Sequence, residues 1–121
     1  MGPIETGAEF ILGIIRDLGV DCSADPQTLN LPGVWITPSG LSQKTLAGTS
    51  GIVTFHVYLI TPNHGWAADV ATLDDLAAKL AGPLGIADWT AETINLANQA
   101  PDPLPCLHGQ TSTEWSNNNV D

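Results

Sequence analysis

Three histidines and two cysteines are the side chains of this chain that could bind a metal ion or move protons: His56, His64, His108, Cys22 and Cys106. Zinc sites use such side chains at close spacings such as C-x-x-C or H-x-x-x-H, because neighbouring ligands must reach one ion together. None of the five has a partner at such a spacing, so we expect neither a metal site nor a cofactor. We expect His56 to hydrogen-bond between strands, His64 to lie in a turn and His108 to lie on a polar strand face.

Two further segments resemble catalytic motifs without matching them. Asp74 and Asp75 are adjacent on an expected helix, where successive side chains point about 100° apart, so both cannot easily act on one substrate. Asp75 is better explained by an i,i+4 ion pair with Lys79. The segment 48–51, Gly-Thr-Ser-Gly, matches neither the G-x-S-x-G nucleophile motif nor a phosphate-binding loop. We therefore expect a protein that is not an enzyme.

The two cysteines have a simpler explanation than chemistry. In a reducing cytoplasm, Cys22 and Cys106 are expected to be free and buried thiols. A disulfide between them is an alternative that the sequence leaves open.

Charge narrows the choice of partners. Asp and Glu number 13, whereas the cations are only three, Arg16, Lys44 and Lys79. Binding to nucleic acid or to an anionic membrane needs clustered cations, so neither is expected. An acidic surface can instead repel a polyanion, as suits a wall past which DNA slides, or it can simply keep a monomer in solution. The apolar run at Phe10–Ile15 is too short to cross a bilayer.

The clearest pattern lies in the middle of the chain. Residues 51–60 alternate as a strand, with Val53, Phe55, Val57 and Leu59 on an apolar side that is expected to meet both helices. Pro62 and Gly65 mark the turn that follows. A helix is then predicted with an apolar stripe, ending at Gly82-Pro83. Its stripe consists of Trp66, Val70, Leu73, Ala77 and Leu80.

A first helix is predicted near the beginning of the chain, ending at Gly19. Its apolar stripe consists of Ile4, Ala8, Ile11, Ile15 and Leu18. Residues 20–33 are expected to form a loop. A short strand, Val34–Thr37, is expected to close at Pro38-Ser39-Gly40.

A second short strand over 41–46 is expected to turn back into the central strand. The segment 38–51 then forms an exposed hairpin or arm, of the kind through which subunits hold one another. The candidate interface residues are Leu41, Ser42, Gln43, Lys44, Thr45 and Leu46.

Two more strands are predicted after the second helix, over 91–98 and 107–115, separated by a segment that Pro101, Pro103 and Pro105 interrupt. One side of the last strand is polar and is expected to share a sheet face with Thr54, His56 and Tyr58. That face is the candidate site for a neighbouring subunit or a channel, with Thr54, His56, Gln110, Ser112 and Glu114 as its residues.

These elements predict an α+β fold in the order α-β-β-β-α-β-β. A small, mostly antiparallel or mixed sheet of four or five strands should carry both helices on one face, because each helix has one apolar stripe and the sheet has one apolar side. One domain is expected over residues 1–115, followed by a flexible polar end, 116–121.

The order of elements resembles a known family. The first helix ends in Arg16-Asp-Leu-Gly-Val20, the strand 32–38 reads Pro-Gly-Val-Trp-Ile-Thr-Pro, and a Gly/Ser/Thr hairpin precedes Phe55-His-Val-Tyr-Leu-Ile-Thr-Pro62 and an Ala/Leu/Asp helix. This arrangement, up to about Trp115, resembles the small tail-terminator proteins of long-tailed bacteriophages.

The resemblance implies a structural virion protein that assembles in the host cytoplasm as a hexameric ring on the last ring of the tail tube. Such a ring stops tube polymerisation and joins the tail to the head connector, while DNA passes through its centre without specific binding. No catalytic residues come with the resemblance. Two alternatives remain: another neck or tail-completion protein, and a small cytoplasmic enzyme or ligand-binding domain with His56 or His108 at its site.

Overall fold

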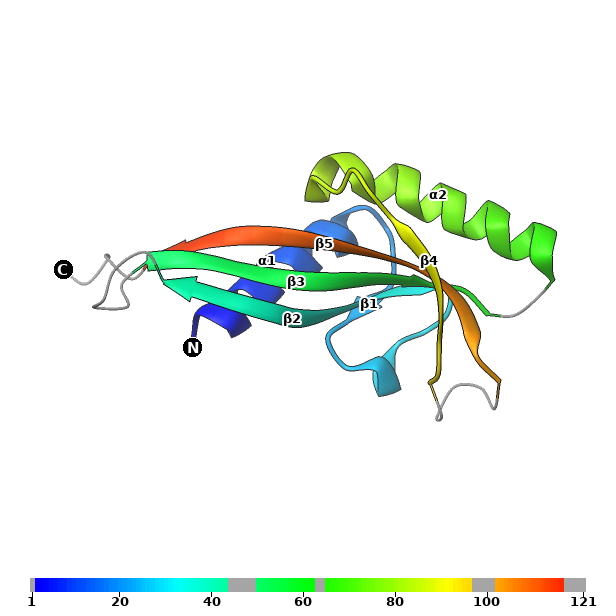
Figure 1. The fold of residues 1–121 in the computed structure, drawn as a ribbon, viewed down its shortest axis with the longest axis horizontal. Helices are drawn as coiled ribbons and strands as arrows, with labels where there is room; N and C mark the ends of the chain where they lie inside the picture. Colours follow the sequence, from blue (N-terminus) through cyan, green and yellow to red (C-terminus); the bar gives the residue numbers. More distant parts are fainter. Residues whose placement is uncertain (1, 44–49, 63–64, 97–101, 117–121) are drawn as a thin grey trace.

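The computed structural model describes residues 2–43, 50–62, 65–96 and 102–116. Its elements are α1 (Pro3–Asp17), β1 (Cys22–Ser23), the 3-10 turn η1 (Pro26–Thr28), β2 (Gly33–Gln43), β3 (Ser50–Ile60), α2 (Trp66–Leu84), β4 (Thr90–Ile94) and β5 (Leu104–Ser116). The strands form one mixed sheet in the order β1-β2-β3-β5-β4, in which only the β1–β2 pair is parallel. The predicted α+β fold and its order of elements are confirmed (Figure 1).

Before α2 the number of strands is as predicted, but their residues differ from the predicted ones. The break expected at Pro38-Ser39-Gly40 is wrong, because β2 is one strand that continues through the bulge between Pro38 and Gly40. Leu41, predicted to begin a second strand, pairs with Val53 in the same β2–β3 ladder. The third strand is instead β1, whose two residues lie in the expected loop 20–33 and are too few to show an alternating pattern.

Pro38 does not end β2 because its missing N–H lies on the unpaired side of the strand. The N–H of Val34 donates to the carbonyl of Asp21, away from β3, at 2.9 Å. Main-chain groups alternate in direction along a strand, so residues 36 and 38 also point away from β3. A proline at such a position removes no bond from the β2–β3 ladder.

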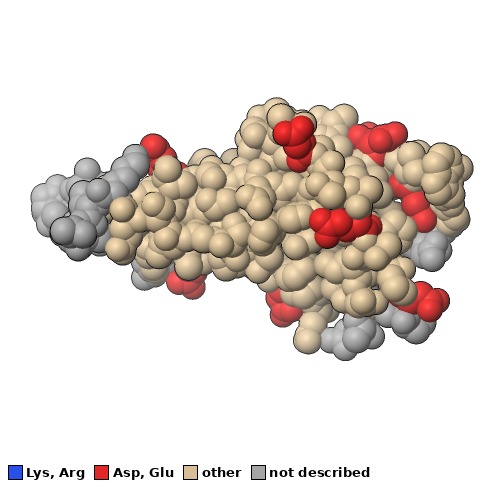
Figure 2. Space-filling view, in the orientation of Figure 1, with Lys and Arg blue, Asp and Glu red and all other residues tan. Residues whose placement is uncertain are grey.

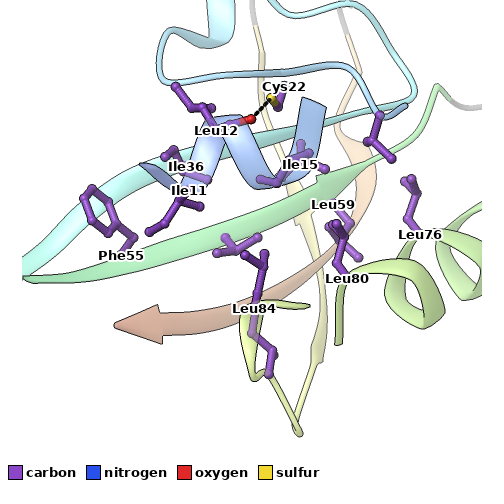
Figure 3. Packing of buried hydrophobic residues seen from close by; sticks show 14 of the residues in the cluster. Ile11, Leu12, Ile15, Cys22, Ile36, Phe55, Leu59, Leu76, Leu80 and Leu84 are labelled. Atoms are coloured by element: carbon purple, nitrogen blue, oxygen red, sulfur yellow. Dashed lines mark hydrogen bonds between the residues drawn. The ribbon is translucent and has the colours of Figure 1, made fainter. Parts of the chain in front are cut away.

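The core lies between one face of the sheet and the two helices (Figure 3). As predicted, the inward side chains of β3 are fully buried: Val53, Phe55, Val57 and Leu59. From α1 they meet Ile11, Leu12 and Ile15, and from α2 they meet Leu73, Leu76, Leu80 and Leu84. Gly7 lets α1 approach the sheet closely, since a Cβ there would lie 3.2 Å from the Phe55 ring.

The apolar stripes of the helices are offset from those predicted. On α1, Leu12 is buried, while Ile4 and Leu18 are exposed. Ile4 lies in the first turn of α1, and Leu18 is the residue that caps its end. On α2, Leu76 is buried, whereas Trp66 is 81% exposed.

The end of α2 also differs from the prediction. The helix passes through Gly82 and Pro83 and ends at Leu84, and Gly85, with φ 67, caps it. The N–H of Ile86 then donates to the carbonyl of Ala81 at 2.9 Å, as helix ends with a left-handed glycine commonly do. Pro83 lies in the last turn, so its missing N–H costs a single helical bond.

The two strands after α2 also have other bounds than those predicted. β4 ends at Ile94, so the predicted strand over 91–98 is too long, and residues 97–98 lie outside the described part. β5 is longer than the strand predicted over 107–115: it begins at Leu104 and contains Pro105, which is expected from the sequence to lie in the segment between the strands. The carbonyl of Pro105 accepts from Thr61 N–H at 3.3 Å, so it points towards β3. The N–H and C=O of one strand residue point the same way, so the missing N–H of Pro105 lies on this side too, just past the last paired residue, Cys106.

Three strands continue past α2 and β4 towards one end of the protein. In Figure 1, α2 lies over the end of the sheet that holds β4, whereas β2, β3 and β5 run on beside α1 towards the other end. We call Pro38–Gln43, Ser50–Phe55 and Thr111–Ser116 the three-stranded extension. Of the candidate hairpin, Leu41, Ser42 and Gln43 belong to it and are exposed. Lys44, Thr45 and Leu46 lie outside the described residues. Of the expected flexible end 116–121, Ser116 instead belongs to β5, and 117–121 lie outside the described part.

Candidate functional site

The face of the sheet opposite the helices carries the predicted polar residues, and we call it the open face. The β3–β5 register places Thr54 opposite Ser112, His56 opposite Gln110 and Ile52 opposite Glu114. The hydroxyls of Thr54 and Ser112 lie 3.1 Å apart in a hydrogen bond. The structure therefore brings together all the residues that the sequence assigned to this face.

A chain of three titratable side chains crosses the open face. His56 Nδ1 lies 2.7 Å from His108 Nε2, and His108 Nδ1 lies 2.9 Å from a carboxylate oxygen of Glu92. An ionised carboxylate only accepts, so His108 donates through Nδ1 to Glu92. In neutral imidazoles, His108 Nε2 then accepts from His56 Nδ1–H. This leaves His56 Nε2 as the basic end of the chain.

Aromatic rings hold this chain in place. Tyr58 stacks on His108 with ring centroids 4.6 Å apart, and Trp35 stacks on the other side of Tyr58 at 5.0 Å. The Trp35 indole N–H donates to the carbonyl of Ala24 at 3.2 Å. The faces of Tyr58 are thus covered by its neighbours, and only the edges of the stack remain for a ligand.

The open face becomes apolar towards the β4 end. A second buried cluster forms there, from Leu29, Ile60, Leu96, Leu104 and Cys106. Loop residues rather than a helix cover it, because Leu29 and Leu96 come from connecting segments. The predicted polar character therefore holds only for the part of the face within and beside the three-stranded extension.

Both cysteines are free, and they lie in different cores. Cys22 belongs to the cluster beneath the helices, where its thiol donates weakly to the carbonyl of Leu12 (Figure 3). Burial raises the pKa of Cys22. Burial, with a smaller effect of Glu92, raises the pKa of Cys106 to about 11. The disulfide left open by the sequence is absent.

The Cys106 thiol predicts an alkaline loss of stability. Its pKa is about 11 in the folded protein against a reference value of 9.0. The folded state therefore holds the proton more tightly, so this contribution is complete below pH 9 and is lost as the pH rises towards 11, by roughly 2–3 kcal/mol. Urea unfolding at about pH 8 and pH 10.5 should show a smaller alkaline loss for Cys106→Ala than for the wild type. Equal losses in both proteins would contradict the assignment.

One hollow borders the open face, and another lies on the helix side of the sheet. One, of about 430 Å³, lies between the α2–β4 connection and β5, and is lined by residues that include Asp88, Thr90, His108 and Gln110. The other, of about 550 Å³, is mostly apolar and lies between α1 and β2, with Ile4, Leu12, Leu41 and Phe55 among its lining residues. Within the described residues, no group of three or more His, Cys, Asp or Glu side chains is placed to hold a metal ion.

Sequence reasoning missed Glu92, Trp35 and the contact between the two histidines. Alternation predicts on which side of its own strand a residue lies, but it does not give the register between strands. His56 and Gln110 form the cross-strand pair, and His108 lies two pairs further along, opposite Tyr58. The contact of His108 with Glu92 depends in turn on the β4–β5 register, for which the sequence holds no signal.

Comparison with known proteins adds no relative. The sequence matches no protein-family model, and a search of curated proteins finds none that is significantly similar. A function must therefore be argued from the fold and the open face.

Proposed function

We propose that this chain is the tail-terminator subunit of a long-tailed bacteriophage. In this role it forms a ring of six copies, the number that the resemblance to that family implies. The ring caps the tail tube, stops its polymerisation and joins the tail to the head connector. It is a structural virion protein, and DNA passes through its centre.

One observation carries this proposal: a sheet that extends beyond α2 and leaves one face uncovered by helices. Core residues from α1 and α2 all lie in the cluster on the opposite face. A monomer has little use for a long extension of this kind, whereas an assembly can bury both its surface and its strand edges. On the other side of the sheet, beside α1, the exposed Leu41 gives the extension an apolar anchor for such a contact.

The charge of the chain supports the same role. Acidic side chains stand at several separate places on the face shown in Figure 2. With a formal net charge of −10, the ring wall would repel a DNA backbone and so let it slide without sticking. Among the described residues, neither helix is long and apolar enough to cross a membrane.

Leu41 offers a direct test. Leu41→Ser should leave the thermal melt nearly unchanged, since the side chain is 43% exposed, but should weaken ring formation at least tenfold. Leu18→Ser is the matched control, because Leu18 is 37% exposed on α1 and lies outside the extension. Native mass spectrometry of the full chain, alone and with the tail-tube protein of the same genome, measures the ring.

Electron microscopy of the same mixtures should show tubes that stop growing when the wild-type chain is present. A chain that stays monomeric with the tube protein and leaves tube length unchanged would rule out the proposal. Rings that bind a head-connector protein but not the tube would instead support the alternative of another neck or tail-completion protein.

A second candidate is a ligand-binding or enzymatic domain, favoured by the Glu92–His108–His56 chain beside the polar hollow. It ranks lower because the hydroxyls of Thr54 and Ser112, on the same face, bond to each other rather than to an imidazole. Native mass spectra that show a monomer with a bound small molecule, lost in His56→Ala, would favour this candidate.

A further inference from the structure

One large aromatic side chain stands out from the surface of the protein. Trp66 is the first residue of α2 and is 81% exposed, more than any other large apolar side chain of the described residues. Tryptophan is among the residues that most often anchor the centre of a protein interface. A single exposed apolar side chain is also common on monomers, so a second feature must supply its partner.

The apolar hollow between α1 and β2 is a place into which such a side chain fits. Its volume is about 550 Å³, within the range of pockets that enclose small molecules, and an indole ring is of that size class. The buried side chains of Ile36 and Phe55 line it, together with Leu41 of the three-stranded extension, which is 43% exposed. An inserted ring would therefore remove apolar surface from water on both sides of the contact.

Charge complementarity favours a second copy of this chain as the occupant. Glu5 and Glu9 also line the hollow, so its occupant should bring hydrogen-bond donors or positive charge rather than acids. The indole N–H of Trp66 only donates, and the helix N-terminus beside it carries a partial positive charge. The acidic residue in the first turn of α2, Asp69, is buried and is not presented to a partner. With 13 acidic residues and three cations, this chain offers few other surfaces of that kind.

The two features lie at opposite ends of the same molecule. In Figure 1, α2 begins near one end of the long axis, whereas α1 begins and β2 finishes towards the other end. Trp66 therefore cannot reach the hollow of its own chain, but it can reach that of a neighbour. A contact between two different patches is head-to-tail, and such contacts close into a ring when the rotation between copies permits.

We propose that Trp66 of one copy inserts into the apolar hollow of the next copy. Its indole ring covers Leu41, and a carboxylate of Glu5 or Glu9 accepts from its N–H. The contact rests on the proposed function, since it is the one by which the subunits of the ring hold one another. It also gives Leu41, a candidate interface residue, a specific partner.

Trp66→Ala tests the inserted side chain. The thermal melt of the full chain should change little, because the side chain is exposed, whereas ring formation should weaken at least tenfold. Phe10→Ala is the matched control, because it removes a 59% exposed aromatic ring from α1 that does not line the hollow. Native mass spectrometry over a concentration series measures both. Rings that Trp66→Ala leaves intact, or that both variants weaken equally, would overturn the contact.

A mixture of two defective variants tests the direction of the contact. Trp66→Ala keeps an intact hollow, and Leu41→Ser keeps an intact Trp66. Neither should form rings alone, but together they should form a one-to-one heterodimer, with Trp66 of the second variant in the hollow of the first. This complex cannot grow, because both of its free ends are defective. The heterodimer should exceed either homodimer at least tenfold, and a mixture with no such excess would contradict the contact.

The same measurements separate this contact from the proposed function. Wild-type rings that do not need Trp66 overturn the contact but leave the ring standing. Rings that need Trp66 but do not stop the growth of tail tubes support the contact and count against the tail-terminator role. A wild-type chain that stays monomeric at every concentration, alone and with the tail-tube protein, overturns both.

Discussion

Phe55→Ala is expected to lower the free energy of unfolding by about 3–5 kcal/mol, the largest loss from a single side-chain truncation in this chain. Phe55 is fully buried and lies between β2, α1 and β5, where Gly7 brings α1 within van der Waals contact of its ring. The helix backbone there cannot move inward to fill the space, since the sheet already limits its approach. The removed ring should therefore leave a cavity.

Phe10→Ala is the matched control, because it also removes a phenylalanine ring, but from the solvent side of α1, the helix that covers Phe55. Phe10 is 59% exposed, so its loss should cost less than about 1 kcal/mol. Chemical denaturation of both variants gives the two differences directly. Similar losses in the two variants would mean that α1 does not pack on β3 through the face described.

Phe55 also shows how far the sequence determines the fold. The alternation along β3 is long and regular, and all four of its predicted inward residues are buried. The buried side of this central strand depends only on its own side chains and on its two neighbouring strands. Its prediction therefore survives errors made elsewhere in the chain.

The failures share a different cause, which is that tertiary contacts overrode local signals. Pro38 predicts the end of a strand. Its missing N–H nevertheless lies on the β1 side of β2, away from the β2–β3 ladder, and β1 is a strand of only two residues. Gly82 and Pro83 read as a helix end, yet Leu84 is buried beneath the helix and Thr111 donates to its carbonyl at 2.6 Å. In each case the deciding partner is far away in the sequence.

The candidate site also has a part that the sequence predicts and a part that depends on distant contacts. Which residues share the open face follows from the period of two along each strand, and the structure places them there. Which of them touch depends on register. The hydrogen bond between His56 and His108, and the contact of His108 with Glu92, therefore emerge only from the assembled sheet.

Gly51→Ala is the second large effect, and it tests the three-stranded extension itself. Gly51 is buried between Gln43 and Trp115 in the ladders on its two sides. A Cβ there would overlap the carbonyl oxygen of Ser42 and lie 2.9 Å from the indole nitrogen of Trp115. Backbone cannot yield as a flexible side chain can, so β2 and β3 must separate locally. The expected loss is roughly 2–4 kcal/mol.

Gly40→Ala provides the control, because Gly40 also lies in the extension but a Cβ there would meet nothing within 4 Å. Its φ is not positive, so alanine fits and should stabilise the protein by up to about 1 kcal/mol through the unfolded chain. The two variants should thus change the free energy of unfolding in opposite directions. If Gly51→Ala unfolds the extension locally, amide exchange should speed up in Ser50–Val53 and Thr113–Ser116 but not in the core of β3. Protection that stays unchanged there would show that the strands are not packed as closely as the ladder requires.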